Sequence, residues 1–197
     1  MTDPQKWIPS CGKFLDFDLD IIKLLLGDVA GDIAEVGVYQ GALFHRLCYW
    51  AKARGCKAHA FDSFEGMGNP GELDGGHYPS GGYICHTEDF AARMTAKNAD
   101  PGVYRLHKGF IPGCFSDGDP EFALIYIDVD QYQPTKDAIE WAVDHLAPGG
   151  LLGFDDFIPN REILAARAID EFRRNTDMKV VFHNINHQIF FRSHESK

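Results

Sequence analysis

The chain has 197 residues, 45% of them hydrophobic, with 19 basic and 29 acidic side chains that give a formal net charge of −10. This size predicts one compact domain over residues 1–197, and the acidic surplus, with no basic stripe, argues against nucleic acid as a partner. No stretch approaches the roughly 18 apolar residues of a membrane span, and the first residues lack the apolar run of a signal peptide. We therefore expect a cytoplasmic protein without a membrane partner.

The number of cysteines, five, is odd, and they include no C-x-x-C pair, which predicts free thiols.

Strands and helices are predicted to alternate along the chain. The apolar spacing of residues 15–26 predicts an entry helix over 13–26, ended by Gly27, within a helical lead-in over 1–30. The expected elements that follow are a strand over 33–36, a helix over 43–51 that ends before Gly55, a strand over 58–61, a helix over 87–97, and strands over 103–106 and 122–127. A further helix is expected from Pro134 to the sequence Pro148-Gly149-Gly150, with Ile139, Ala142, Val143 and Leu146 facing inward. The last expected elements are a strand over 151–154, a helix over 161–174, and a hairpin over 179–182 and 188–191.

This order predicts an α/β fold with a doubly wound, mostly parallel sheet of seven strands and a C-terminal antiparallel hairpin. Ligands of such sheets bind at the carboxyl ends of the strands. The glycine-rich residues 66–86 follow the second strand and are predicted to form a lid loop, in which Tyr78 and Tyr83 offer flat surfaces to a ring. The alternative is an unstructured connector.

The first candidate motif lies in the turn after the first strand. Residues 35–41 read Glu-Val-Gly-Val-Tyr-Gln-Gly, an E-x-G-x-x-x-G spacing that differs from the dinucleotide-binding G-x-G-x-x-G. A glycine turn lets a ligand lie against the backbone, and Glu35 could receive an ammonium group. A plain tight turn with a solvated glutamate explains the motif equally well.

The second candidate is Asp62, at the end of the second strand. A carboxylate at this place can accept the hydroxyl groups of a ribose, and together with Glu35 it favours an adenosine-type cofactor. The alternative role is a cap for the segment that follows.

The third and strongest candidate is a set of four acids at the ends of two apolar strands. Asp128 and Asp130 follow one strand, and Asp155 and Asp156 follow the next. If these strands are neighbours, their carboxylates share one pocket, where like charges need protons or a hard divalent cation. Oxygen ligands favour magnesium, calcium or manganese. The alternative is that the four acids are solvated and cap the following helices.

Together these motifs resemble the macrocin O-methyltransferase (TylF-type) family of S-adenosylmethionine-dependent sugar O-methyltransferases. The resemblance rests on E-V-G-V-Y-Q-G, F-D-S-F-E-G-M, I-D-V-D-Q-Y and F-D-D-F, and it implies a Rossmann-like class I methyltransferase fold. It implies cofactor contacts at Glu35, Gly37, Tyr39, Gly41, Asp62, Ser63 and Gly109, metal ligation by Asp128, Asp155 and Asp156, and a general base at Asp130.

The expected function is methyl transfer from S-adenosylmethionine to one hydroxyl of a vicinal diol in a sugar moiety of a natural product. The reaction is expected to need a divalent cation, for which Mg²⁺ is the first choice. The alternatives are a catechol-type enzyme acting on a phenolic diol, a magnesium-dependent hydrolase, and an inert cofactor-binding protein of the same fold. The histidines at 45, 77, 86 and 107 are alternative bases. The expected partner is a small-molecule acceptor, and a homo-oligomer is left open.

Overall fold

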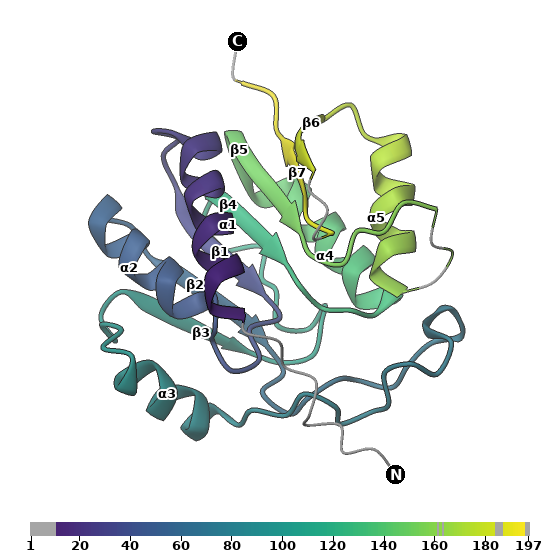
Figure 1. Cartoon of the computed structure of the whole chain (residues 1–197), viewed down its shortest axis with the longest axis horizontal. Helices are drawn as coiled ribbons and strands as arrows, with labels where there is room; N and C mark the ends of the chain where they lie inside the picture. Colours follow the sequence, from purple (N-terminus) through teal and green to yellow (C-terminus); the bar gives the residue numbers. More distant parts are fainter. Residues whose placement is uncertain (1–10, 161, 163, 184–186, 196–197) are drawn as a thin grey trace.

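A computed structural model describes residues 11–160, 162, 164–183 and 187–195, with side chains from residue 19 onward. The described residues form a seven-stranded sheet of order β3-β2-β1-β4-β5-β7-β6 (Figure 1). The elements are α1 (Cys11–Leu26), β1 (Asp32–Val36), α2 (Phe44–Arg54), β2 (Ala58–Asp62), the 3₁₀ turn η2 (Glu72–Asp74), α3 (Thr87–Ala96), β3 (Tyr104–Lys108), β4 (Phe122–Ile127), α4 (Tyr132–His145), β5 (Leu146–Phe154), α5 (Leu164–Asn175), β6 (Lys179–His183) and β7 (Ile189–Arg192).

The predicted doubly wound sheet is confirmed. Strands β1 to β5 pair in parallel, whereas β7 pairs antiparallel with both β5 and β6 and so forms the expected terminal hairpin. Helices α1, α2 and α3 pack on one face of the sheet, and α4 and α5 cover the other. The central strand β4 is buried along its whole length, as its apolar sequence predicts.

Two expected boundaries are wrong. Helix α4 begins at Tyr132 rather than Pro134, and Val143 is 48% exposed rather than inward. Strand β5 begins at Leu146, before the Pro148-Gly149-Gly150 sequence that was expected to separate it from the helix. The pairing with β4 is irregular across this sequence: Phe122 pairs with Leu146, and the next pair is Leu124 with Leu151.

The remaining boundaries lie close to those expected. Helix α5 begins at Leu164, and residues 161 and 163 of its expected first turn lie outside the described residues, as do residues 184–186 of the hairpin turn. None of the described helices is long and apolar enough to cross a lipid bilayer.

Candidate active site

A cavity of about 780 Å³ lies at the carboxyl ends of β1, β2, β4 and β5. Among the residues that line it, seven carry a carboxylate: Glu35, Asp62, Asp128, Asp130, Asp137, Asp155 and Asp156. Within the described part of the chain, the lining includes no Lys, Arg or His. The cavity therefore favours ligands that bring positive charge.

Glu35 lies on β1 at the base of this cavity. Its side chain is only 3% exposed, and its Oε2 atom has no hydrogen-bond partner among the described residues. Burial raises the pKa of Glu35 well above its ordinary value, and the charges of Asp62 and Asp155 raise it further. A buried carboxylate oxygen without a partner is costly, so this atom is a candidate receptor for a cationic ligand group.

The turn after β1 is held between two neighbouring strands. Gly37 donates its N–H to the carbonyl of Phe61 on β2 at 2.8 Å and has a left-handed φ of +85°. A Cβ at this position would lie 2.0 Å from the carbonyl oxygen of Asp128, at the end of β4. Only glycine therefore allows this turn to approach the acid-bearing end of β4 so closely.

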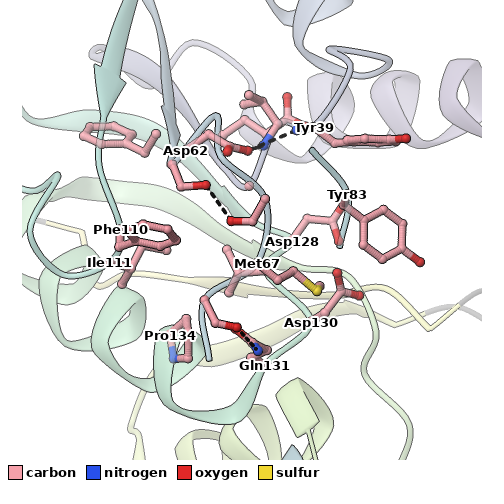
Figure 2. A pocket seen from close by; sticks show the side chains of 18 of the residues that line it. Tyr39, Asp62, Met67, Tyr83, Phe110, Ile111, Asp128, Asp130, Gln131 and Pro134 are labelled. Atoms are coloured by element: carbon pink, nitrogen blue, oxygen red, sulfur yellow. Dashed lines mark hydrogen bonds between the residues drawn. The ribbon is translucent and has the colours of Figure 1, made fainter. Parts of the chain in front are cut away.

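Asp62 fixes the same turn through its carboxylate. Its Oδ2 atom accepts the N–H groups of Val38 at 2.9 Å and Tyr39 at 3.1 Å (Figure 2). Its Oδ1 atom accepts the N–H of Phe64 at 2.7 Å. A carboxylate offers about four acceptor sites, so about one remains for a ligand hydroxyl. Asp62 lines the cavity as predicted, and the structure also gives it the alternative role of a cap.

The other predicted cofactor residues fall into two groups. Tyr39, Ser63 and Gly109 line the cavity. Gly41 is not among the lining residues, because it faces α3: a Cβ there would lie 3.0 Å from both the Met94 sulfur and the Phe90 ring. The second glycine of the motif thus permits close packing against α3.

The four acids that follow β4 and β5 meet as expected. The backbone places them, since the Asp128 N–H donates to Val36 on β1 and the Asp155 N–H donates to Ile127 on β4. Carboxylate oxygens of Asp128, Asp130 and Asp156 lie within 4.8 Å of one another, an arrangement that could hold a metal ion. Asp155 lines the same cavity but is not part of this group.

Burial and mutual repulsion raise the pKa of two of these acids, Asp128 and Asp130. Burial raises the pKa of Asp128 well above its ordinary value, and the charges of Asp155, Asp130, Asp156 and Glu35 add to this. Burial, together with a hydrogen bond and the charge of Asp156, raises the pKa of Asp130 to about 8. A divalent cation would offset the same repulsion without protons.

The turns that carry the acids adopt uncommon backbone conformations. Asp130 has a φ of 60° and Asp156 a φ of 58°, in the left-handed region that few residues other than glycine enter. The Asp130 carbonyl accepts the N–H of Ala165 on α5 at 2.9 Å, which helps to fix the first of these turns. Such strain is commonly found at functional sites.

Residues of the lid loop, defined as residues 66–86, lie beside the acids. Burial, and then the nearby charge of Asp130, raises the pKa of the Tyr78 hydroxyl, which lies beside the Asp130 carboxyl. The Tyr83 ring packs edge-on against the Tyr39 ring, with centroids 5.4 Å apart. The sequence had indicated the loop and its tyrosines but not the contact with Asp130.

The far end of the cavity is apolar and was missed by the sequence reasoning. Phe110, Ile111 and Pro134 lie together there, with Met67 between them and the acidic end that holds Asp130 (Figure 2). These residues come from the loop after β3 and from the start of α4. The only signal in the sequence for this apolar end was that Gly109 and the residues after it directly follow the end of a strand.

The chain is similar to known methyltransferases. A methyltransferase domain family matches residues 34–157. A curated relative from Streptomyces olivaceus, named 8-demethyl-8-(2,3-dimethoxy-alpha-L-rhamnosyl)-tetracenomycin-C 4'-O-methyltransferase, is 31% identical over 161 residues. The match covers 69% of this chain and 57% of the relative, so the chain spans little more than half of that protein's length.

Solved structures support the fold. The O-methyltransferase NovP has a TM-score of 0.76 at 19% identity, covering 90% of this chain and 80% of NovP. The calicheamicin methyltransferase CalS11 has a TM-score of 0.70 at 19% identity, covering 91% of this chain and 78% of CalS11. These similarities confirm the predicted Rossmann-like class I methyltransferase fold, while the narrower macrocin-type resemblance stays a prediction. Because the family match spans more than half of the chain and includes the turn after β1, Asp62 and all four clustered acids, the chain belongs to the methyltransferase domain family.

Proposed function

We propose that this protein is an S-adenosylmethionine-dependent O-methyltransferase that acts on one hydroxyl of a vicinal diol in a sugar moiety of a natural product. The observation that carries the proposal is the buried, unpartnered Oε2 atom of Glu35, which faces the same cavity as four clustered acids. The family match and the name of the Streptomyces olivaceus relative support the reaction class and the sugar acceptor.

The cavity fits the proposed cofactor from end to end. Glu35 would receive the ammonium group of the methionine part, and the Gly37 turn would lie against its backbone. The remaining acceptor site of Asp62 would take a ribose hydroxyl, and Ser63 and Gly109 would line the adenosine part. The apolar end, described above, suits the flat adenine ring. When bound, S-adenosylmethionine supplies an electrophilic methyl group on a positively charged sulfur.

The acids fit a divalent cation, for which we propose Asp128, Asp155 and Asp156 as ligands. These half-buried carboxylates face no basic side chain of the described chain across the cavity, and hard cations prefer such oxygen ligands. A cation bound there, most simply Mg²⁺, would supply positive charge that lowers the pKa of an acceptor hydroxyl. The observed grouping of Asp130 with Asp128 and Asp156 offers a different third ligand, which the variants proposed in the Discussion distinguish.

Asp130 is the proposed general base. Asp130 lies beside the proposed ligands Asp128 and Asp156, so a bound cation would lower its pKa and keep the carboxylate ionised, as a base must be. The Tyr78 hydroxyl beside it would orient this carboxylate. Asp130 would take the proton of the acceptor hydroxyl as its oxygen attacks the methyl carbon. A strongly acidic pocket suits a neutral, poorly acidic sugar better than a phenolate.

The test is methyl transfer to a simple neutral diol. Purified protein would be incubated with S-adenosylmethionine and para-nitrophenyl α-L-rhamnoside, in Mg²⁺ or in EDTA, and the methylated glycoside measured by mass spectrometry. We expect product in Mg²⁺ but not in EDTA, and none with Asp155→Ala. Methylation of catechol alone would favour a phenolic acceptor, and cofactor binding without any transfer would favour the inert protein.

A further inference from the structure

Helix α4 begins two residues after Asp130, and its N-terminus lacks a cap from its own sequence. Gln131, at the capping position, makes no capping hydrogen bond with its side chain. The first N–H groups of a helix have no partner within the helix and need one from elsewhere. Here the N–H of Tyr132 donates to Oδ1 of Asp74 at 2.8 Å, a residue of the lid loop 58 positions earlier in the chain.

Asp74 is built into the lid rather than exposed on it. The residue is 2% exposed, and its second carboxylate oxygen, Oδ2, accepts the N–H of Gly71 at 2.6 Å. Its carbonyl accepts the N–H of His77 at 3.1 Å. One carboxylate therefore joins the start of α4 to the short turn η2, and its backbone continues the same hydrogen-bonded turn toward Tyr78.

A second contact joins the same two segments. The Gln131 side chain is 3% exposed, and its Nε2 atom donates to the carbonyl of Gly68 at 3.2 Å (Figure 2). The lid loop is thus fastened to two consecutive residues, Gln131 and Tyr132, directly after the proposed base Asp130. Figure 1 shows the loop running from the end of β2 across the edge of the sheet toward α5.

From these contacts we propose that Asp74 is a positioning residue of the methyl transfer: by capping α4 from the lid loop, it fixes the loop over the clustered acids and keeps the Tyr78 hydroxyl beside the Asp130 carboxylate. Tyr78 lies four residues after Asp74, within the segment that this cap fixes. Asp74 touches neither the proposed base nor the cavity, so it would act through Tyr78. The inference rests on the proposed function for its effect on turnover.

The test compares four variants with the wild-type full chain. Asp74→Ala removes both acceptors, Asp74→Asn keeps one acceptor oxygen, Tyr78→Phe removes only the hydroxyl, and the double variant combines Asp74→Ala with Tyr78→Phe. Glu72→Ala is the matched control, because Glu72 is an exposed acid in the same turn and does not line the cavity. Turnover number, KM for para-nitrophenyl α-L-rhamnoside, cofactor affinity and thermal unfolding are measured for each.

We expect Asp74→Ala to lower the turnover number by about 10–100-fold, the usual range for residues that orient a reactive group, with cofactor affinity unchanged. Asp74→Asn should lose less, and Glu72→Ala nothing. The double variant should be no slower than the slower single variant, because both changes break one path to Asp130. Losses that multiply in the double variant, or a faster Asp74→Ala enzyme, would overturn the proposal.

A second measurement does not depend on activity. Amide hydrogen exchange of residues 66–86 should accelerate in Asp74→Ala at least about tenfold and remain unchanged in Glu72→Ala, because a released loop opens more often. Unchanged exchange in Asp74→Ala would overturn the proposal. If the wild type transfers no methyl group, the proposed function fails, and the exchange result still decides whether Asp74 fixes the lid.

Discussion

The most informative single residue is Glu35. A buried carboxylate without a partner weakens the fold, so its presence needs a compensating role in binding. The sequence showed an acid beside a glycine turn but left its solvation open, because burial depends on the packing of β1 between β2 and β4. The partners of Asp62 were equally hidden, since backbone N–H groups carry no sequence signal.

Replacing Glu35 by Gln tests this role. We expect Glu35→Gln to weaken S-adenosylmethionine binding by about 10–100-fold, because a hydrogen bond to a charged group contributes about 1.5–3 kcal/mol. The ligand-free variant should also unfold at a higher temperature near neutral pH, since it removes a buried carboxyl whose ionisation burial and the neighbouring acids disfavour. Calorimetric titration and thermal unfolding measure the two effects. The control is Glu121→Gln, an exposed position where neither property should change. Unaltered cofactor affinity in Glu35→Gln would contradict the assigned role.

The roles of Asp155 and Asp130 can be separated in the same way. Asp155→Asn should abolish Mg²⁺ binding, because it removes a charged ligand, whereas Asp130→Asn should keep Mg²⁺ binding and lose turnover by about 10²–10⁴-fold. Calorimetry with Mg²⁺ and the methyl-transfer assay measure the two properties. Loss of Mg²⁺ binding in Asp130→Asn but not in Asp155→Asn would show that Asp128, Asp130 and Asp156 form the ligand set that their geometry allows.

At the scale of elements, local patterns predicted the strands and helices but not their long-range partners. The sequence Pro148-Gly149-Gly150 looks like a terminator, yet it lies within β5. Gly149 donates its N–H to His194, and Gly150 accepts the N–H of Ser193, so the end of the chain pairs with these residues. Likewise, Asp74 and α4 are 58 positions apart, so no local pattern could reveal their contact.

The turn after β1 makes an element-scale prediction. Gly37→Ala should destabilise the protein by about 3 kcal/mol or more and abolish cofactor binding, because it combines a left-handed backbone with a clash against Asp128. Gly55→Ala is the matched control: Gly55 ends α2 with a φ of 74°, and a Cβ there meets no atom within 4 Å. It should cost only about 1 kcal/mol and leave binding intact. An equal loss of unfolding free energy in Gly37→Ala and Gly55→Ala, measured by chemical denaturation, would contradict the predicted clash at Gly37.

At the scale of the whole molecule, seven of the 29 acidic side chains line the cavity, and no basic side chain of the described residues does. Residues 117–156 carry ten acidic side chains and one basic side chain, and they include all four clustered acids. Five of these ten acids line the cavity, so a large part of the local charge excess faces the proposed cation site. Composition alone had only argued against nucleic acid.

This concentration predicts how stability depends on pH. The pKa of Asp130 is raised from 3.8 to about 8 in the folded protein, and those of Glu35 and Asp128 are also raised. Between these values the folded state binds more protons than the unfolded state, so stability should fall as pH rises from about 4 to about 8. Thermal unfolding in EDTA should occur at a lower temperature at pH 8 than at pH 6, by about 2–4 °C per kcal/mol lost. Excess Mg²⁺ should reduce the difference; a transition temperature in EDTA that rises with pH over this range would contradict the burial of these acids.

The central claim is that one acidic cavity holds both S-adenosylmethionine and a divalent cation. The most direct test is calorimetric titration of the wild-type chain with S-adenosylmethionine, in Mg²⁺ and in EDTA, followed by titration with Mg²⁺. We predict one cofactor site that is present in both buffers and is weakened by Glu35→Gln, and one Mg²⁺ site that Asp155→Asn removes. The absence of cofactor binding by the wild type would contradict the account.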